Sequence, residues 1–60
     1  MTTMDYVRSV EARTADDAAT VVKALARADR YVPVTVKSIR NEKPAPWPRW
    51  RVTLAVKVAK

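Results

Sequence analysis

Apolar and polar residues alternate most regularly near the end of the chain, over residues 50–59. Every second residue of this segment is apolar, namely Trp50, Val52, Leu54, Val56 and Val58. The residues between them are mostly polar or small, which is the pattern of a strand with one buried face. The pattern therefore predicts that residues 50–59 form the most apolar strand of a sheet.

A second segment, residues 4–13, alternates less regularly. One phase holds the apolar residues Met4, Tyr6, Val10 and Ala12. Arg8 interrupts that phase, and the opposite phase is mainly polar, with Asp5 and Glu11 among its members. We predict a strand here with one face turned to solvent.

A third strand is predicted over residues 31–40, where Val32, Val34 and Val36 alternate with polar side chains. Ile39 falls in the opposite phase, which indicates a bulge near residues 37–38. Pro33 has no backbone N–H to donate to a neighbouring strand, so this strand is expected at an edge of the sheet.

A helix is predicted over residues 14–30, because this alanine-rich segment begins with Thr14, a favoured N-cap residue, and has Asp17 three positions later. Acidic residues lie near its start and basic residues near its end, which complements the helix dipole. The apolar residues at helical spacing are expected to form its buried stripe: Ala18, Val21, Val22, Leu25 and Ala28.

The order of elements is β-α-β-β, and we predict an α+β fold built as a single small domain of residues 1–60. A right-handed crossover makes the first two strands parallel. Inserting the third strand between them gives a three-stranded mixed sheet of order 2-3-1, a split β-α-β arrangement with one helix packed on one face. This order centres the most apolar strand and leaves the strand of Pro33 at an edge. It also turns Asp5 and Glu11 toward the same face as Arg51 and Lys57, where opposite charges would pair across strands.

The composition narrows the kinds of function. The chain has 60 residues with no Cys, no His and no Gly. These absences argue against a disulfide, a zinc site and any glycine-rich phosphate loop, so we expect no cofactor and no metal. Ser9 and Ser38 have no evident general base beside them in the sequence, and we expect no enzymatic activity. The absence of Cys and of a long apolar run predicts a cytoplasmic protein that does not enter a membrane.

Charge is unevenly distributed along the chain. Residues 1–22 carry two basic and four acidic groups, a sum of −2, whereas residues 23–60 carry ten basic and two acidic groups, a sum of +8. This asymmetry suggests a polyanionic partner for the second half of the chain. A well-solvated surface is the alternative explanation.

The connection over residues 42–49 contains three prolines and Trp47, and it is too poor in Gly and Asn for a tight hairpin turn. Alternating prolines favour an extended polyproline conformation, which would make a stiff arm. Trp47 is then either an exposed contact residue or a side chain folded back on the core, whereas the phase of Trp50 places it in the core, with Tyr6 and Tyr31 at the core's end.

The candidate partner-binding residues lie on or near this hairpin: Lys37, Arg40, Lys43, Trp47, Arg49 and Arg51. Nucleic-acid binding is the leading hypothesis, since basic groups contact phosphates and an aromatic ring stacks on bases. The alternative is a protein–protein interaction adaptor or inhibitor that uses the same loop or the open sheet face. The small size and basic charge resemble in type the accessory proteins of bacteriophages and mobile elements.

A homodimer is also expected, because a chain of this length buries only about 60% of its unfolded surface. Pairing of exposed strand edges, especially the edge with Val34 and Val36, is one route. Packing of open sheet faces through Val7, Ala55 and Ile39 is the other.

Overall fold

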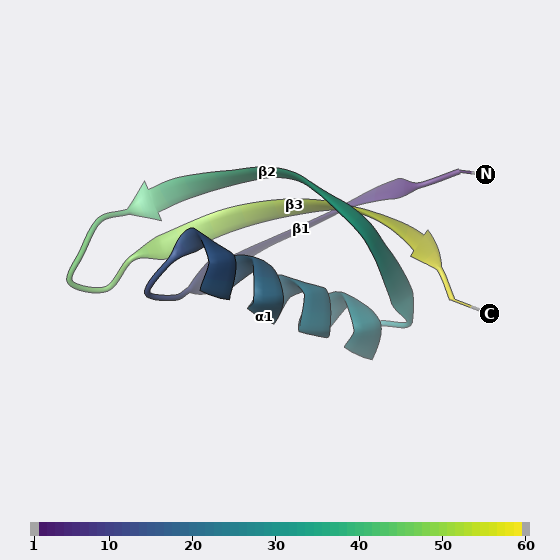
Figure 1. Ribbon diagram of the computed structural model, residues 1–60, viewed down its shortest axis with the longest axis horizontal. Helices are drawn as coiled ribbons and strands as arrows, with labels where there is room; N and C mark the ends of the chain where they lie inside the picture. Colours follow the sequence, from purple (N-terminus) through teal and green to yellow (C-terminus); the bar gives the residue numbers. More distant parts are fainter. Residues whose placement is uncertain (1, 60) are drawn as a thin grey trace.

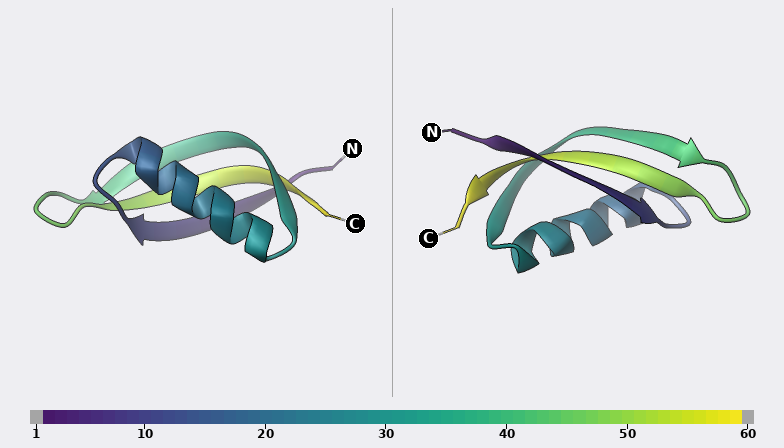
Figure 2. Two further views of the ribbon diagram at one scale, coloured as in Figure 1. Left: turned by 60° about the horizontal axis from the view of Figure 1, so that its bottom comes forward. Right: turned by 180° about the vertical axis from the view of Figure 1, so that it is seen from behind.

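The computed structural model describes residues 2–59 and shows the predicted order of elements. Strand β1 spans Met4–Glu11, helix α1 spans Ala15–Ala28, strand β2 spans Tyr31–Lys43 and strand β3 spans Arg49–Val58. The sheet order is β1-β3-β2, so the predicted central position of the third strand is confirmed. β3 is antiparallel to both neighbours, and β1 and β2 therefore run in the same direction. The helix lies along one face of the sheet (Figures 1 and 2).

The start of α1 follows the sequence signal. Thr14 has an extended backbone, with φ of −135° and ψ of 164°, and its hydroxyl accepts a hydrogen bond of 3.1 Å from the N–H of Asp17. The helix ends at Ala28, two residues before the predicted boundary, with Asp29 as the C-cap. Arg30 follows with a φ of 66°, the left-handed conformation that commonly ends a helix. This residue turns the chain into β2.

The buried stripe of α1 differs from the prediction. Ala18, Val22 and Ala26 are fully buried, and Ala19 is nearly so. Val21 and Leu25, both predicted in the stripe, keep 41% and 39% of their surface exposed, and Ala28, also predicted there, is exposed as well. The helix axis crosses the strands obliquely (Figure 2), and small alanine side chains along the line of contact let its backbone approach the twisted sheet closely.

The core is built on β3, as its alternating pattern predicts. Val52, Leu54 and Val56 are buried to within 1% of complete. Trp50 packs partly buried against this core, and its predicted structural role is confirmed. Ile39 does so as well, which corrects its expected place on the open face of the sheet. A register shift between Val36 and Ser38, where the bulge was predicted, rotates Ile39 to stand opposite Val52.

Arg8 occupies an apolar phase of β1 because it has two partners there, the ring of Tyr6 on the same strand and the carboxylate of Asp29 at the end of α1. Its guanidinium lies 4.8 Å from the centre of the Tyr6 ring, and its Nη2 lies 3.5 Å from Oδ2 of Asp29. The Tyr6 hydroxyl donates a hydrogen bond to the same carboxylate, and the Tyr6 and Tyr31 rings lie 5.6 Å apart. Burial raises the pKa of the Tyr6 phenol, the bond to Asp29 acts in the same direction, and the nearby Arg8 opposes both.

Strand β2 is the more irregular edge of the sheet. Its pairing with β3 shifts register at three places, between Pro33 and Thr35, between Val36 and Ser38, and between Asn41 and Lys43. The sequence predicts only the middle of these three shifts. The predicted strand ends at Arg40, whereas β2 continues for three more residues to Lys43. The longer strands shorten the connection to residues 44–48, which turn at Ala45 and Pro46 with a cis peptide bond between them. The prediction of an extended polyproline arm is therefore wrong.

The β2–β3 hairpin projects beyond the first turn of α1 (Figure 1) and gives the molecule its length. The extents along the principal axes are 39, 18 and 13 Å. The end of the hairpin is thus covered by the helix on neither face, which leaves its side chains available to a partner.

Candidate nucleic-acid interface

The face of the sheet opposite α1, here called the open face, carries a group of basic side chains at the hairpin end. Residues that stand directly opposite each other in an antiparallel ladder share a face. Because Val52 and Leu54 are buried against the helix, their odd-numbered neighbours in β3 point the other way. Arg51 stands opposite Arg40, and Arg49 stands opposite Lys43. These four exposed residues, Arg40, Lys43, Arg49 and Arg51, form what we call the basic cluster.

The basic cluster contains two like-charge pairs of the β2–β3 ladder, Arg40 with Arg51 and Lys43 with Arg49, separated by the pair of Asn41 and Trp50. Like charges directly opposite each other destabilise a sheet, so this arrangement opposes folding rather than supporting it. Two carboxylates lie near the four cations, Glu42 on β2 and Glu11, which stands opposite Arg49 on β1. Four positive charges against two negative charges leave a local excess of two.

Glu42 is the only carboxylate bound to the cluster within residues 2–59. Its Oε2 lies 2.9 Å from Nη2 of Arg51, and its Oε1 accepts a hydrogen bond of 2.7 Å from the hydroxyl of Ser9. In that part of the chain Arg40, Lys43 and Arg49 form no ion pair. Three of the four cations are therefore exposed without a carboxylate bound to them in the described residues.

The contact between Ser9 and Glu42 was not anticipated, because the sequence shows no base near this serine. The carboxylate that the fold brings to Ser9 is already paired with Arg51, and both Ser9 and Glu42 lie at the surface. The hydroxyl acts as a second donor to the same carboxylate, which holds the side chain of Glu42 across β3. The hydroxyl of Ser9 therefore fixes the position of Glu42, the carboxylate that pairs with Arg51.

Lys37, predicted as a supporting member of the site, lies apart from the cluster. Its Nζ lies 2.8 Å from Oδ1 of Asp5, in an ion pair that spans β3. Asp5 stands opposite Ala55, four residues from Arg51 along β3, which is roughly 13 Å at 3.3 Å per residue. Asp5 and Glu11 do share a face with Arg51, as predicted, but the ion pair of Asp5 is with Lys37 and that of Arg51 is with Glu42.

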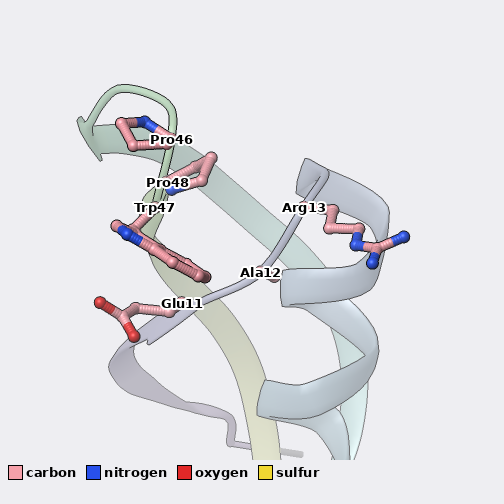
Figure 3. Close-up of a pocket in the computed structure, with 6 residues that line it drawn as sticks. All are labelled: Glu11, Ala12, Arg13, Pro46, Trp47 and Pro48. Carbon is pink, nitrogen blue, oxygen red and sulfur yellow. The ribbon is translucent and has the colours of Figure 1, made fainter.

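Trp47 lies at the tip of the hairpin with 69% of its surface exposed, so it is not folded into the core. Its indole points from the loop toward the end of β1, beside Glu11, whereas the side chain of Arg13 points away (Figure 3). The ring forms one wall of a shallow pocket of about 450 Å³. The pocket is lined by Glu11, Ala12, Arg13, Pro46, Trp47 and Pro48.

Two hydrogen bonds hold the base of the hairpin against the segment that follows β1. The backbone N–H of Ala12 donates to the carbonyl of Pro48 over 3.1 Å, and the indole Nε1 of Trp50 donates to the carbonyl of Ala12 over 3.0 Å. Trp50 therefore positions the loop that presents Trp47. The structure thus brings five of the six predicted residues to one end of the sheet, four in the basic cluster and Trp47 at the tip.

Two further features were sought in the described residues, a metal-binding cluster and a membrane-spanning helix. Across residues 2–59, no three acidic side chains gather closely enough to hold a metal ion. In the same range, α1 is too short and too polar to cross a membrane. Comparison of the chain with protein-family models, with curated proteins and with solved structures finds no match.

Proposed function

We propose that this chain is a small, non-enzymatic cytoplasmic protein that binds nucleic acid through the basic cluster and Trp47. The observation that carries the proposal is that two pairs of cations stand opposite each other across β2 and β3, Arg40 with Arg51 and Lys43 with Arg49. A bound polyanion would remove a repulsion that the free protein retains, because phosphate groups between the cations screen them from one another.

The exposed indole favours single-stranded nucleic acid over a duplex. Trp47 lies at the same end of the sheet as Arg49 and Lys43, which flank the loop. An aromatic side chain stacks on the face of an unpaired base and contributes about 1–3 kcal/mol per base, with little preference for sequence. Bases in a duplex offer no such free face along the strand. A site for single-stranded nucleic acid requires basic side chains that contact the phosphates and an aromatic ring that stacks on a base, and the basic cluster and Trp47 supply both.

A direct test is the binding of fluorescently labelled oligonucleotides, single-stranded and duplex, followed by anisotropy at low salt. The double variant R40Q/R49Q removes two unpaired charges from the basic cluster. Its matched control, R27Q/R30Q, removes two exposed arginines at the end of α1. We expect weaker binding for the first variant and unchanged binding for the second. Equal loss in both variants would show that only net charge matters, and no binding by the unmodified chain would refute the proposal.

A protein partner at the same tip is the second candidate, and the pocket beside Trp47 favours it. Pro46, Pro48 and an exposed indole form an apolar wall of the kind that receives a side chain of another protein. This adaptor or inhibitor function, of the bacteriophage or mobile-element type, requires a complex that tolerates salt and survives nuclease treatment. W47A would abolish such a complex, whereas R40Q/R49Q would leave it nearly intact.

A further inference from the structure

The two edges of the sheet differ in how well they are protected from pairing with another strand. β2 contains Pro33 and three register shifts, which are features that hinder strand addition. β1 contains no proline, and its eight residues pair with β3 in unbroken register from Met4 to Glu11. The free edge of β1 is therefore the more regular template for a further strand.

The backbone groups that β1 turns outward can be identified from one hydrogen bond. The N–H of Ala12 donates to Pro48, so the backbone of Ala12 points toward β3. The direction alternates along a strand, and the odd-numbered residues of β1 therefore point their N–H and C=O groups away from β3. Asp5, Val7, Ser9 and Glu11 present these unpaired groups at the edge.

We propose that this edge binds a second copy of the chain, with β1 antiparallel to β1 about a two-fold axis at Val7. The result is a continuous six-stranded sheet of order β2-β3-β1-β1-β3-β2. Val7 would stand opposite Val7 of the second copy, and Asp5 opposite Ser9. Val7 is 43% exposed in the single chain, and pairing with its own copy covers it.

Charge complementarity selects this register among those that a two-fold axis permits. With the axis at Val7, Arg8 stands opposite Tyr6 of the other copy and Asp5 stands opposite Ser9, so no charged residue of β1 faces a like charge. With the axis at Arg8, that arginine would oppose itself and Asp5 would oppose Glu11, so every charged pair would be repulsive. With the axis at Tyr6, the last three residues of β1 would lose their partners inside the strand. Only the axis at Val7 pairs most of the strand without opposing like charges.

A second copy is favoured over an unrelated strand because the match is self-complementary. Met4, 41% exposed, would stand opposite Val10, so apolar side chains meet on the helix-covered face as well. A chain of 60 residues also gains more from added burial than a larger domain does. The inference rests on the β1 edge and does not depend on the proposed function.

The arrangement has one consequence for the basic cluster. A two-fold axis perpendicular to the sheet keeps both open faces on the same side. The two basic clusters would then lie on one surface, roughly 30 Å apart at about 3.3 Å per residue and 4.8 Å per strand. One dimer would present two equivalent anion-binding regions to a single polyanion.

A disulfide cross-link tests the register, because the chain has no cysteine of its own. In V7C the two thiols would face each other across a hydrogen-bonded pair with Cα atoms about 5.5 Å apart, within disulfide range. In S9C the thiols would be four residues apart, roughly 13 Å, and out of range. We expect a covalent dimer from oxidised V7C and none from S9C or from V34C on the other edge. Equal cross-linking of V7C and S9C would overturn the register.

Sedimentation equilibrium of the unmodified chain, V7K and V34K tests the dimer without a covalent bond. Both variants place one lysine at an exposed valine of a sheet edge, so the change of charge is the same. We expect the unmodified chain and V34K to sediment with twice the mass of 6.8 kDa, and V7K to weaken dimerisation at least tenfold. Circular dichroism would show that V7K remains folded. An unmodified chain that is monomeric throughout, or a dimer lost in V34K and kept in V7K, would overturn the proposal.

Discussion

Replacing Trp47 with alanine distinguishes a side chain that serves binding from one that serves folding. Trp47 keeps 69% of its surface exposed, so about a third of the residue is covered by the rest of the chain. A tryptophan side chain offers up to about 250 Å². The covered part is then about 80 Å², which at about 25 cal/mol per Å² corresponds to at most about 2 kcal/mol of stability.

The measurement is chemical denaturation followed by tryptophan fluorescence. In W47A the remaining Trp50 reports on unfolding, because it packs against the core and donates to the carbonyl of Ala12. We expect W47A to lose less than about 2 kcal/mol and to remain folded. W50F, which removes the indole N–H and part of a packed ring, serves as the comparison and is expected to cost about 1–3 kcal/mol.

In W47A the loss of affinity for nucleic acid should be large although the loss of stability is small. Loss of one base stack costs about 1–3 kcal/mol, which weakens affinity for single-stranded nucleic acid by roughly 5- to 150-fold. The oligonucleotide titration described above, applied to W47A and W50F, measures the loss of affinity in each variant. If W47A lost 3 kcal/mol or more of stability while its folded fraction bound normally, Trp47 would be a structural residue and the binding role would be refuted.

Three further changes test how the fold is held. T14A removes the hydroxyl that caps α1 and should cost about 1 kcal/mol in the free energy of unfolding, measured by denaturation. A26L overpacks the buried contact between helix and sheet and should cost about 1–3 kcal/mol, whereas A28L at an exposed position should be nearly neutral. Because the pKa of Tyr6 is raised in the folded protein, its neutral phenol stabilises the folded state. This stabilisation is complete below pH 10.0, the ordinary pKa of tyrosine, and is lost as the pH rises through the pKa of the folded protein. Thermal unfolding should show that loss above about pH 10 in the unmodified chain and a smaller one in Y6F; equal slopes would contradict this.

The sequence predicts best the features that depend on neighbouring residues. The cap at Thr14 requires only an oxygen and an N–H three residues later, and β3 alternates without interruption. The sheet order follows from two such local facts, the apolar character of β3 and the missing N–H of Pro33.

The buried stripe of α1 was mispredicted because apolar character alone does not show how closely two elements approach. Val21 and Leu25 are more apolar than alanine, yet Ala18 and Ala26 make the contact. A small side chain is favoured where the helix backbone comes nearest to the sheet, and that line depends on the twist of the strands.

The partners of the charged residues could not be predicted, because they depend on the bulges of β2. A residue out of phase revealed the bulge before Ile39, but the shifts near Pro33 and Asn41 leave no comparable trace in the pattern. Those shifts decide which side chains of β2 reach the open face. They bring Glu42 to Arg51 and Lys37 to Asp5, contacts that no spacing in the sequence indicates.

The salt dependence of binding tests the central claim, that the basic cluster contacts phosphates. The logarithm of the binding constant for single-stranded nucleic acid falls with the logarithm of salt concentration by about 0.7 for each phosphate contact. R40Q/R49Q should therefore have a slope shallower by about 1.4 than the unmodified chain, while R27Q/R30Q keeps the original slope. If all three proteins shared one slope, or if the unmodified chain bound no nucleic acid at low salt, the basic cluster would not be a phosphate-binding site.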